Sequence, residues 1–271
     1  MTIQPVDIPG GRLLVESDGA GDPVVVLLHA GVTDKALWDG VVPALAESRR
    51  VVRYDLRGFG ASSPPAAPFT HADDLLSLLD ALEVERAVLV GASLGARVAL
   101  EFAASHPGRV AGLALFASPL PRHDRSPAMR AYAEAEDAAL NAGDLDAAVR
   151  LNLDMWVRGP SRAWDERLRG HAASVREGLR VSLEHQHLTD TWEEIARPDL
   201  VEVLGEIDVP ALVAVGSDDV PDFVEIAGRL AAELPRARPV RLPGTGHLIA
   251  TERPKETADI LLTFLTELPT P

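Results

Sequence analysis

The chain of 271 residues contains no cysteine, few aromatic residues and no long apolar run. Without cysteine it can form no disulfide and no thiolate metal site, and it cannot use a cysteine nucleophile. Aromatic residues make up only 4% of the chain, so alanine, leucine and valine must fill most of the core. No segment approaches the roughly 18 consecutive apolar residues of a membrane-spanning helix, and residues 1–11 lack the features of a signal peptide. We therefore expect a cytoplasmic protein without a membrane partner.

Basic residues are also scarce relative to acidic ones. The chain has 26 lysines and arginines against 41 aspartates and glutamates, which gives a formal net charge of −15. Such a surface repels phosphate backbones, so no nucleic-acid partner is expected. The length suits one large α/β domain, or such a domain with an insertion.

The most informative stretch is residues 88–97, with the sequence VLVGASLGAR. Residues 88–90 have the composition of a buried parallel strand, and residues 96–104 that of a helix packed on a sheet. A strand that turns directly into a helix needs a tight bend, and a glycine two positions before and after Ser93 allows it. The serine at the apex is expected in a strained conformation with its hydroxyl projecting from the sheet. Ser93 is therefore the predicted nucleophile.

Strands and helices alternate on both sides of this stretch. Further strands are predicted at 2–8, 11–17, 24–28, 50–54, 110–117, 211–215 and 239–242, and helices at 36–48, 70–83, 223–234 and 254–268. The first two strands favour an antiparallel pair. The later alternation requires right-handed crossovers and a mostly parallel sheet, with the loops after its strands at one edge. The predicted fold class is α/β, with about eight strands and helices on both faces.

The alternation breaks between residues 120 and 206, where no convincing strand is found. Helical composition recurs at 126–141, 145–157, 164–187 and 198–204. A segment of this length is too long for a simple loop, so it is predicted to be a helical subdomain over the catalytic edge. The core domain then comprises residues 1–119 and 207–271.

A serine nucleophile needs an imidazole to take its proton and a carboxylate to orient that imidazole. His247 alone among the eight histidines lies in a loop after a late strand and follows a carboxylate loop of the same kind. The carboxylate is Asp218 or Asp219, and we favour Asp219, three residues past the glycine that ends the strand. Asp218 is then a turn residue or solvated. Asp222 is predicted to cap the next helix.

Five motifs together resemble the α/β-hydrolase superfamily. They are LHAG (28–31), DLRGFGAS (55–62), GASLG (91–95), GSDD (216–219) and GTGH (244–247), and their Ser…Asp…His order is that of the family. The resemblance is to the cap-bearing subgroup of esterases, lactonases, carbon–carbon bond hydrolases and cofactor-free haloperoxidases. It implies no metal and no organic cofactor. It also implies an oxyanion hole from the backbone amides of Leu94 and Gly31, although Ala30 stands where the family usually has glycine.

Other residues of these motifs receive structural interpretations. His29 is interpreted as a hydrogen-bonded structural residue, and Asp55 and Arg57 as supports of the catalytic edge. Aromatic residues of the insertion either line a substrate pocket or pack the insertion onto the core. The pocket candidates are Tyr132, Trp156, Trp164 and Trp192.

The predicted function is a serine hydrolase that cleaves a small carboxylic ester or lactone through an acyl-enzyme. The alternatives on the same triad are a carbon–carbon bond hydrolase, an acyltransferase and a cofactor-free haloperoxidase. A further alternative is a non-catalytic small-molecule receptor or signalling partner. The expected partner is a small-molecule ester or lactone substrate, and a homodimer is a candidate assembly.

Overall fold

The computed structural model describes residues 1–188, 193–195 and 199–269. One eight-stranded sheet runs through it in the order β1-β2-β4-β3-β5-β6-β7-β8. Its strands are β1 (Thr2–Ile8), β2 (Gly11–Asp18), β3 (Val24–Leu28), β4 (Val51–Tyr54), β5 (Ala87–Ala92), β6 (Val110–Phe116), β7 (Ala211–Gly216) and β8 (Ala237–Leu242). The β1–β2 and β2–β4 pairs are antiparallel and all the others are parallel. The predicted fold class is confirmed.

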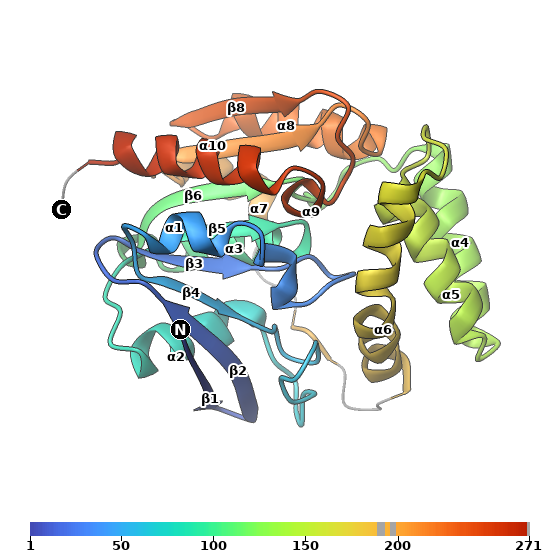
Figure 1. Cartoon of the computed structure of the whole chain (residues 1–271), viewed down its shortest axis with the longest axis horizontal. Coiled ribbons are helices and arrows are strands. Elements are labelled where there is room, and N and C mark those ends of the chain that lie inside the picture. The colour runs from blue at the N-terminus through green and yellow to red at the C-terminus, as the bar shows by residue number, and fades with distance from the viewer. Residues whose placement is uncertain (189–192, 196–198, 270–271) are drawn as a thin grey trace.

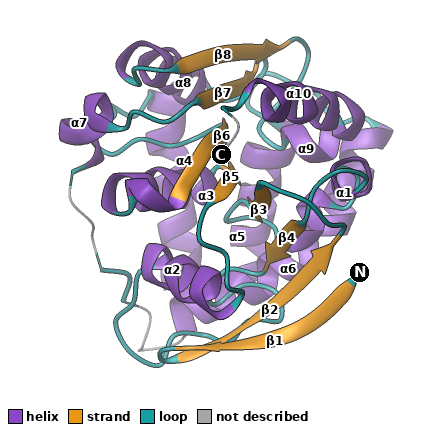
Figure 2. Cartoon of the chain, turned by 90° about the vertical axis from the view of Figure 1, so that its left-hand side faces the viewer, coloured by secondary structure: helices purple, strands orange, loops and turns teal. Residues whose placement is uncertain are grey.

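Helices cover both faces of the sheet (Figures 1 and 2). One layer contains α1 (Val42–Ala46), α9 (Ile249–Glu252) and α10 (Pro254–Glu267), and the other contains α2 (His71–Ala81), α3 (Leu94–Ser105) and α8 (Pro221–Glu233). Strand β3 is apolar throughout because both of its faces are buried. Val25 and Leu27 pack into one core while Val26 and Leu28 pack into the other, and every residue of the strand is buried. A strand covered on both faces has no polar side.

The prediction of one continuous helix over residues 36–48 is wrong. The structure has a 3₁₀ turn, η1 (Lys35–Trp38), and then the short helix α1. Pro43 lies in the first turn of α1. Proline lacks an N–H group and its ring collides with the carbonyl of the preceding turn, so one helix cannot run through this position.

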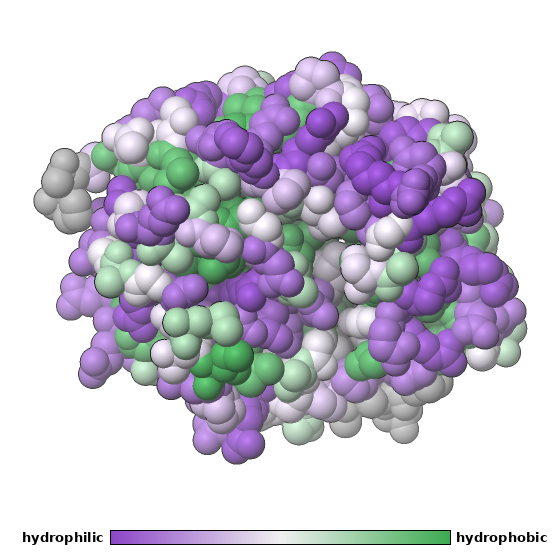
Figure 3. All heavy atoms as spheres, viewed as in Figure 1, coloured by the Kyte–Doolittle hydropathy of each residue, from purple (hydrophilic) through white to green (hydrophobic). Residues whose placement is uncertain are grey.

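A helical insertion lies between β6 and β7. It contains α4 (Pro127–Asn141), α5 (Leu145–Asn152), a π-helical segment η3 (Leu153–Arg158) and α6 (Glu166–Leu188), followed by the short α7 (Leu200–Val203) and the 3₁₀ turn η4 (Leu204–Glu206). In Figure 1 the arrowheads of β3 and β8 point toward α4, α5 and α6, so the insertion stands at the carboxyl edge of the sheet. Most atoms over it are hydrophilic on the face shown in Figure 3. None of the described helices is long and apolar enough to cross a membrane.

Candidate active site

Ser93 occupies a strained turn between β5 and α3. Its backbone angles are φ 50° and ψ −113°, a region that costs about 1–3 kcal/mol for a residue with a side chain. Its N–H group donates to the carbonyl of Phe116 at 2.8 Å. A Cβ atom on Gly91 would overlap the backbone of Gly95, and a Cβ atom on Gly95 would overlap the backbone of Leu28. The turn therefore has the conformation and the close packing that the sequence predicted.

Asp219 and His247 form a buried pair at the same edge of the sheet. The imidazole Nδ1 lies 3.0 and 3.1 Å from the two carboxylate oxygens of Asp219. The side chain of His247 is only 2% exposed, and that of Asp219 is 0% exposed. A neutral imidazole that donates from Nδ1 to a carboxylate keeps Nε2 free to accept a proton. Asp218 has another partner, because its Oδ1 accepts from Ser217 Oγ at 2.7 Å.

The loop after β3 packs against the beginning of α3. A Cβ atom built on Gly31 would lie 3.6 Å from Leu94 Cβ, so the two residues predicted to bind an oxyanion are neighbours. The N–H group of Gly95 donates to the carbonyl of His29 at 3.1 Å and holds the two segments together. Among the described residues, none is hydrogen-bonded to Ser93 Oγ. Catalytic hydrogen bonds often form only when a substrate is bound.

His29 supports this loop from inside the core. The backbone N–H of Leu56 donates to its Nε2 at 2.9 Å, and its Nδ1 lies 2.8 Å from the carbonyl of Ala30. Burial lowers the pKa of His29 because the charged imidazolium would lose its hydration. The ring is therefore a neutral, hydrogen-bonded structural residue, as the sequence interpretation held.

Asp55 and Arg57 hold the loop that follows β4. Asp55 accepts from the backbone N–H groups of Lys35 and Ala61, each at 3.0 Å. Arg57 donates to Asp74 at 2.6 and 2.8 Å, and to two carbonyls in the turn between β1 and β2. Both residues support neighbouring loops, in agreement with their interpretation from sequence.

The aromatic candidates of the insertion have different neighbours. The ring of Trp156 lies 4.7 Å from that of His247, and the hydroxyl of Tyr132 accepts from the Trp156 indole N–H at 3.0 Å. Trp164 instead donates to Asp154 at 3.0 Å and lines a cavity of about 340 Å³ between α5, η3 and α6. Trp192 lies outside the described residues. Among the described candidates, Trp156 is thus the one in contact with His247, and Tyr132 is hydrogen-bonded to the Trp156 indole.

Two further residues of this region, one in contact with His247 and one with Gly246, are not among the site residues predicted from the sequence. The ring of Phe223 lies 4.6 Å from the imidazole, and the buried Glu252 accepts from the backbone N–H of Gly246 at 3.1 Å. Phe223 follows Asp219 by one helical turn, which is the only sequence signal for it. Nothing in the sequence around Glu252 marks its role, since its partners come from other parts of the chain.

The expectation that Asp222 caps α8 is wrong. The N-cap residue is Val220, which has no side-chain capping bond, and Asp222 lies within the first turn. Its Oδ1 accepts instead from the backbone N–H of Ser126 at 2.7 Å. Pro221 supplies the fixed φ angle and missing N–H that suit the first helical position. Asp222 is therefore available to fasten the beginning of the insertion to α8.

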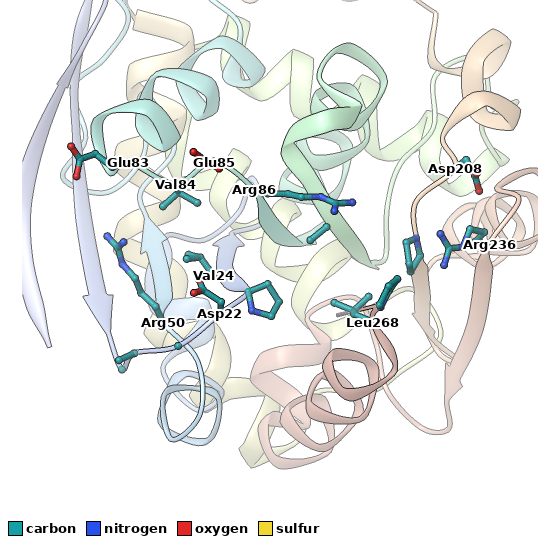
Figure 4. A pocket seen from close by; sticks show the side chains of 17 residues that line it. Asp22, Val24, Arg50, Glu83, Val84, Glu85, Arg86, Asp208, Arg236 and Leu268 are labelled. Atoms are coloured by element: carbon teal, nitrogen blue, oxygen red, sulfur yellow. The ribbon is translucent and has the colours of Figure 1, made fainter. Parts of the chain in front are cut away.

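A separate cavity of about 650 Å³ opens at the opposite edge of the sheet (Figure 4). Its lining includes Val24 at the beginning of β3, Arg86 before β5 and Pro210 before β7. These are the amino ends of parallel strands, whereas ligands of open α/β sheets bind at the carboxyl ends. This cavity contains neither Ser93 nor His247 in its lining and is not the candidate active site.

Comparison with known proteins identifies the family to which the chain belongs. Residues 23–254 match the model of the alpha/beta hydrolase fold. The chain is 36% identical over 181 residues to 2-hydroxymuconate semialdehyde hydrolase of Pseudomonas sp. (strain CF600), a match that covers 64% of this chain and 61% of that relative. It is 35% identical over 226 residues to a pimeloyl-[acyl-carrier protein] methyl ester esterase of Methylococcus capsulatus, covering 81% of this chain and 85% of the relative. The crystal structure of the enol-lactonase from Burkholderia xenovorans LB400 aligns with a TM-score of 0.79 at 26% identity, over 97% of this chain and 100% of that one. The chain therefore belongs to the alpha/beta hydrolase fold family.

Proposed function

We propose that this protein is a serine hydrolase that cleaves a small carboxylic ester or lactone. The observation that carries the proposal is the buried Asp219–His247 pair at the sheet edge that also bears the strained Ser93. His247 Nε2 takes the proton from Ser93 Oγ as the oxygen attacks the carbonyl carbon. The same proton is then given to the leaving alcohol, which leaves an acyl-enzyme. Water activated by His247 releases the acid.

The backbone amides of Gly31 and Leu94 are proposed to stabilise the negative oxygen of each tetrahedral intermediate. The close approach of these two residues supports the assignment. Fixed donors aimed at a developing charge contribute more than donors that must reorient during the reaction. Asp219 holds the imidazole in the correct tautomer and stabilises its charged form. The chain's own residues thus account for every proton transfer.

The surroundings of His247 favour an uncharged group in the substrate. Trp156 and Phe223 present aromatic rings to the imidazole. We assign the helical insertion, residues 120–206, as a cap over the site, and this cap supplies Trp156. The ester and lactone in the names of two similar proteins are of this chemical kind.

A second candidate function is hydrolysis of a carbon–carbon bond by the same residues. The 36% identity to a 2-hydroxymuconate semialdehyde hydrolase favours it. The two candidates differ in the leaving group, which is an alkoxide in one and a carbanion in the other. A substrate that has no ester bond, and whose leaving carbanion is stabilised by a neighbouring carbonyl group, therefore distinguishes them, because only the carbon–carbon hydrolase cleaves it.

The test is hydrolysis of a panel of p-nitrophenyl esters and small lactones by the wild type and by Ser93→Ala. We expect ester or lactone turnover in the wild type and a loss of roughly 10⁴- to 10⁶-fold in kcat for the variant, because the acyl-enzyme cannot form. A fluorophosphonate should label the wild type, and mass spectrometry should place the label on Ser93. Equal and poor hydrolysis of the whole panel by both proteins would remove the esterase assignment. Tight binding of a small molecule with little turnover would favour the receptor alternative instead.

A further inference from the structure

Residues 156–162 of the insertion contact the histidine loop at two separate points. One contact is made to the imidazole ring of His247, and the other reaches the backbone next to it through Glu252. Trp156 lies within the π-helical segment η3, and Arg162 lies in the loop four residues past its end. Segments of π-helix are often found at functional sites.

The first contact places the indole of Trp156 against His247. The ring centroids are 4.7 Å apart with an interplanar angle of 44°, and Phe223 packs edge-on against the same imidazole. The indole itself is fixed, because its N–H donates to the hydroxyl of Tyr132 at 3.0 Å. That hydroxyl is hydrogen-bonded in turn to Asn152 at 2.8 Å. The orientation of the Trp156 ring is therefore set by a polar network within the insertion.

The second contact runs through a buried ion pair. Arg162 donates to both carboxylate oxygens of Glu252, at 2.7 and 2.9 Å, and the Glu252 side chain is only 2% exposed. The same carboxylate accepts from the backbone N–H of Gly246, the residue before His247. A Cβ atom on Gly246 would overlap the guanidinium of Arg162, so the glycine makes room for this contact. Arg162 thus helps to fix the main chain that bears the imidazole, together with Arg167, whose Nη1 donates to the same carboxylate at 3.1 Å.

We propose that Trp156 and Arg162 are positioning residues for His247, so that the cap forms part of the catalytic machinery instead of only covering it. The inference rests on the proposed function, in which His247 is the general base. Asp219 fixes one ring nitrogen but does not by itself fix the plane of the ring or the position of the loop. Trp156 restricts the plane and Arg162, through Glu252, restricts the loop. An aromatic face beside the imidazole also stabilises the imidazolium that forms during turnover.

A cap that merely lines the pocket would give different results. Pocket residues contribute binding energy that depends on the size of the acyl group, and their loss raises KM for large substrates. Residues that position the base lower kcat for every substrate, including the smallest. They also slow the reaction of Ser93 with a small organophosphate, which needs the activated serine but little of the pocket.

The experiment compares Arg162→Met and Trp156→Leu with the wild type, using p-nitrophenyl acetate and diisopropyl fluorophosphate. We expect kcat and the rate of Ser93 phosphorylation to fall roughly 10- to 100-fold, with KM changed far less, because small displacements of a catalytic group have effects of this size. Trp156→Phe keeps a ring beside His247 and should recover most of the rate. Arg180→Met is the matched control, since Arg180 makes its ion pairs with Asp146 and Glu184 inside the insertion.

Folding is controlled with circular dichroism and with a milder variant. Tyr132→Phe removes only the hydroxyl that fixes the Trp156 indole, and it should still lower the phosphorylation rate several-fold. Wild-type kcat and phosphorylation rates in folded Arg162→Met, Trp156→Leu and Tyr132→Phe would overturn the positioning role, even if KM for larger esters rises. That result differs from failure of the proposed function, in which the wild type itself shows no hydrolysis dependent on Ser93.

Discussion

Asp218 and Asp219 are adjacent in the chain, but their carboxylates have different partners. Asp219 lies against His247 Nδ1, while Asp218 accepts from the hydroxyl of Ser217. Asp219→Asn should lower kcat roughly 10³- to 10⁴-fold, because an amide no longer fixes the productive tautomer or stabilises the imidazolium. Asp218→Asn keeps a carbonyl oxygen for Ser217 and should stay within about threefold of the wild type.

Ester turnover by the two variants at one pH provides the measurement. Each protein is first checked for an unchanged circular dichroism spectrum, so that a loss of rate is not a loss of fold. If Asp218→Asn is the inactive protein and Asp219→Asn the active one, the two carboxylates exchange roles in the mechanism.

Single residues of the site differ in how far the sequence identifies them. Ser93 lies in a five-residue motif between a strand and a helix, and His247 follows a glycine-rich loop after the last strand, so the local pattern predicts both as candidates. Phe223 and Glu252 have no local signature, because their importance comes from contact with His247 or Gly246. Tertiary contacts of this kind are not encoded in any short stretch of sequence.

For whole elements, too, the sequence predicts what a local pattern determines and misses what depends on tertiary contacts. The buried strands β3, β5 and β7 were predicted within a residue or two, because an uninterrupted apolar run between turn signals has few other interpretations. The helix predicted over 145–157 was right in position but not in type. It changes from α-helix to π-helix at Leu153, and no residue there breaks the helical pattern. Trp156, which contacts His247, lies in this π-helical segment, so the part that the sequence missed includes a contact of the site.

Arg57 joins the loop after β4 to α2 and to the turn between β1 and β2. It is almost completely buried, and it links Asp74 on α2 to the turn between β1 and β2. Burial already raises the pKa of Asp74 despite the guanidinium beside it. Arg57→Met would leave that carboxylate buried without its partner, so we expect a loss of about 3–5 kcal/mol in the free energy of unfolding.

Urea denaturation of Arg57→Met and of a surface control tests this expectation. Arg12 pairs with Asp7 where both side chains are more than half exposed, so Arg12→Met should change the free energy by no more than about 1 kcal/mol. Equal losses in the two variants would mean that Arg57 is not a special link between these elements. A loss confined to Arg57→Met supports its role.

For the molecule as a whole, two buried histidines contribute to the dependence of stability on pH. His29 and His71 are almost fully buried, and burial lowers the pKa of each, that of His71 well below its ordinary value of 6.5. Among the described residues, neither ring nitrogen of His71 has a hydrogen-bond partner. Both rings therefore stay neutral in the folded protein at a pH where the unfolded chain binds a proton on each.

The two histidines make the folded protein less stable at low pH, because the unfolded chain binds more protons than the folded one. Because the unfolded state takes up more protons below about pH 6.5, the free energy of unfolding should fall as the pH is lowered, by up to about 1.4 kcal/mol per pH unit for each histidine. A second effect opposes it. The net charge of −15 shrinks as the pH approaches the isoelectric point near 4.9, which relieves repulsion in the compact state.

The variant His71→Phe separates the two effects. It leaves the net charge at neutral pH unchanged and replaces the imidazole, with its two unpartnered nitrogens, by a larger apolar ring. At pH 8 the gain from removing unpaired polar atoms is therefore opposed by the cost of fitting the extra volume among Phe59 and Phe69. Between pH 8 and 5.5, where most carboxylates remain ionised, urea denaturation should show a steeper loss of stability in the wild type than in the variant. The difference between the two slopes belongs to His71 alone, because charge repulsion is common to both proteins until the histidine titrates. Parallel slopes would mean that the His71 imidazole takes up a proton in the folded protein as readily as in the unfolded chain.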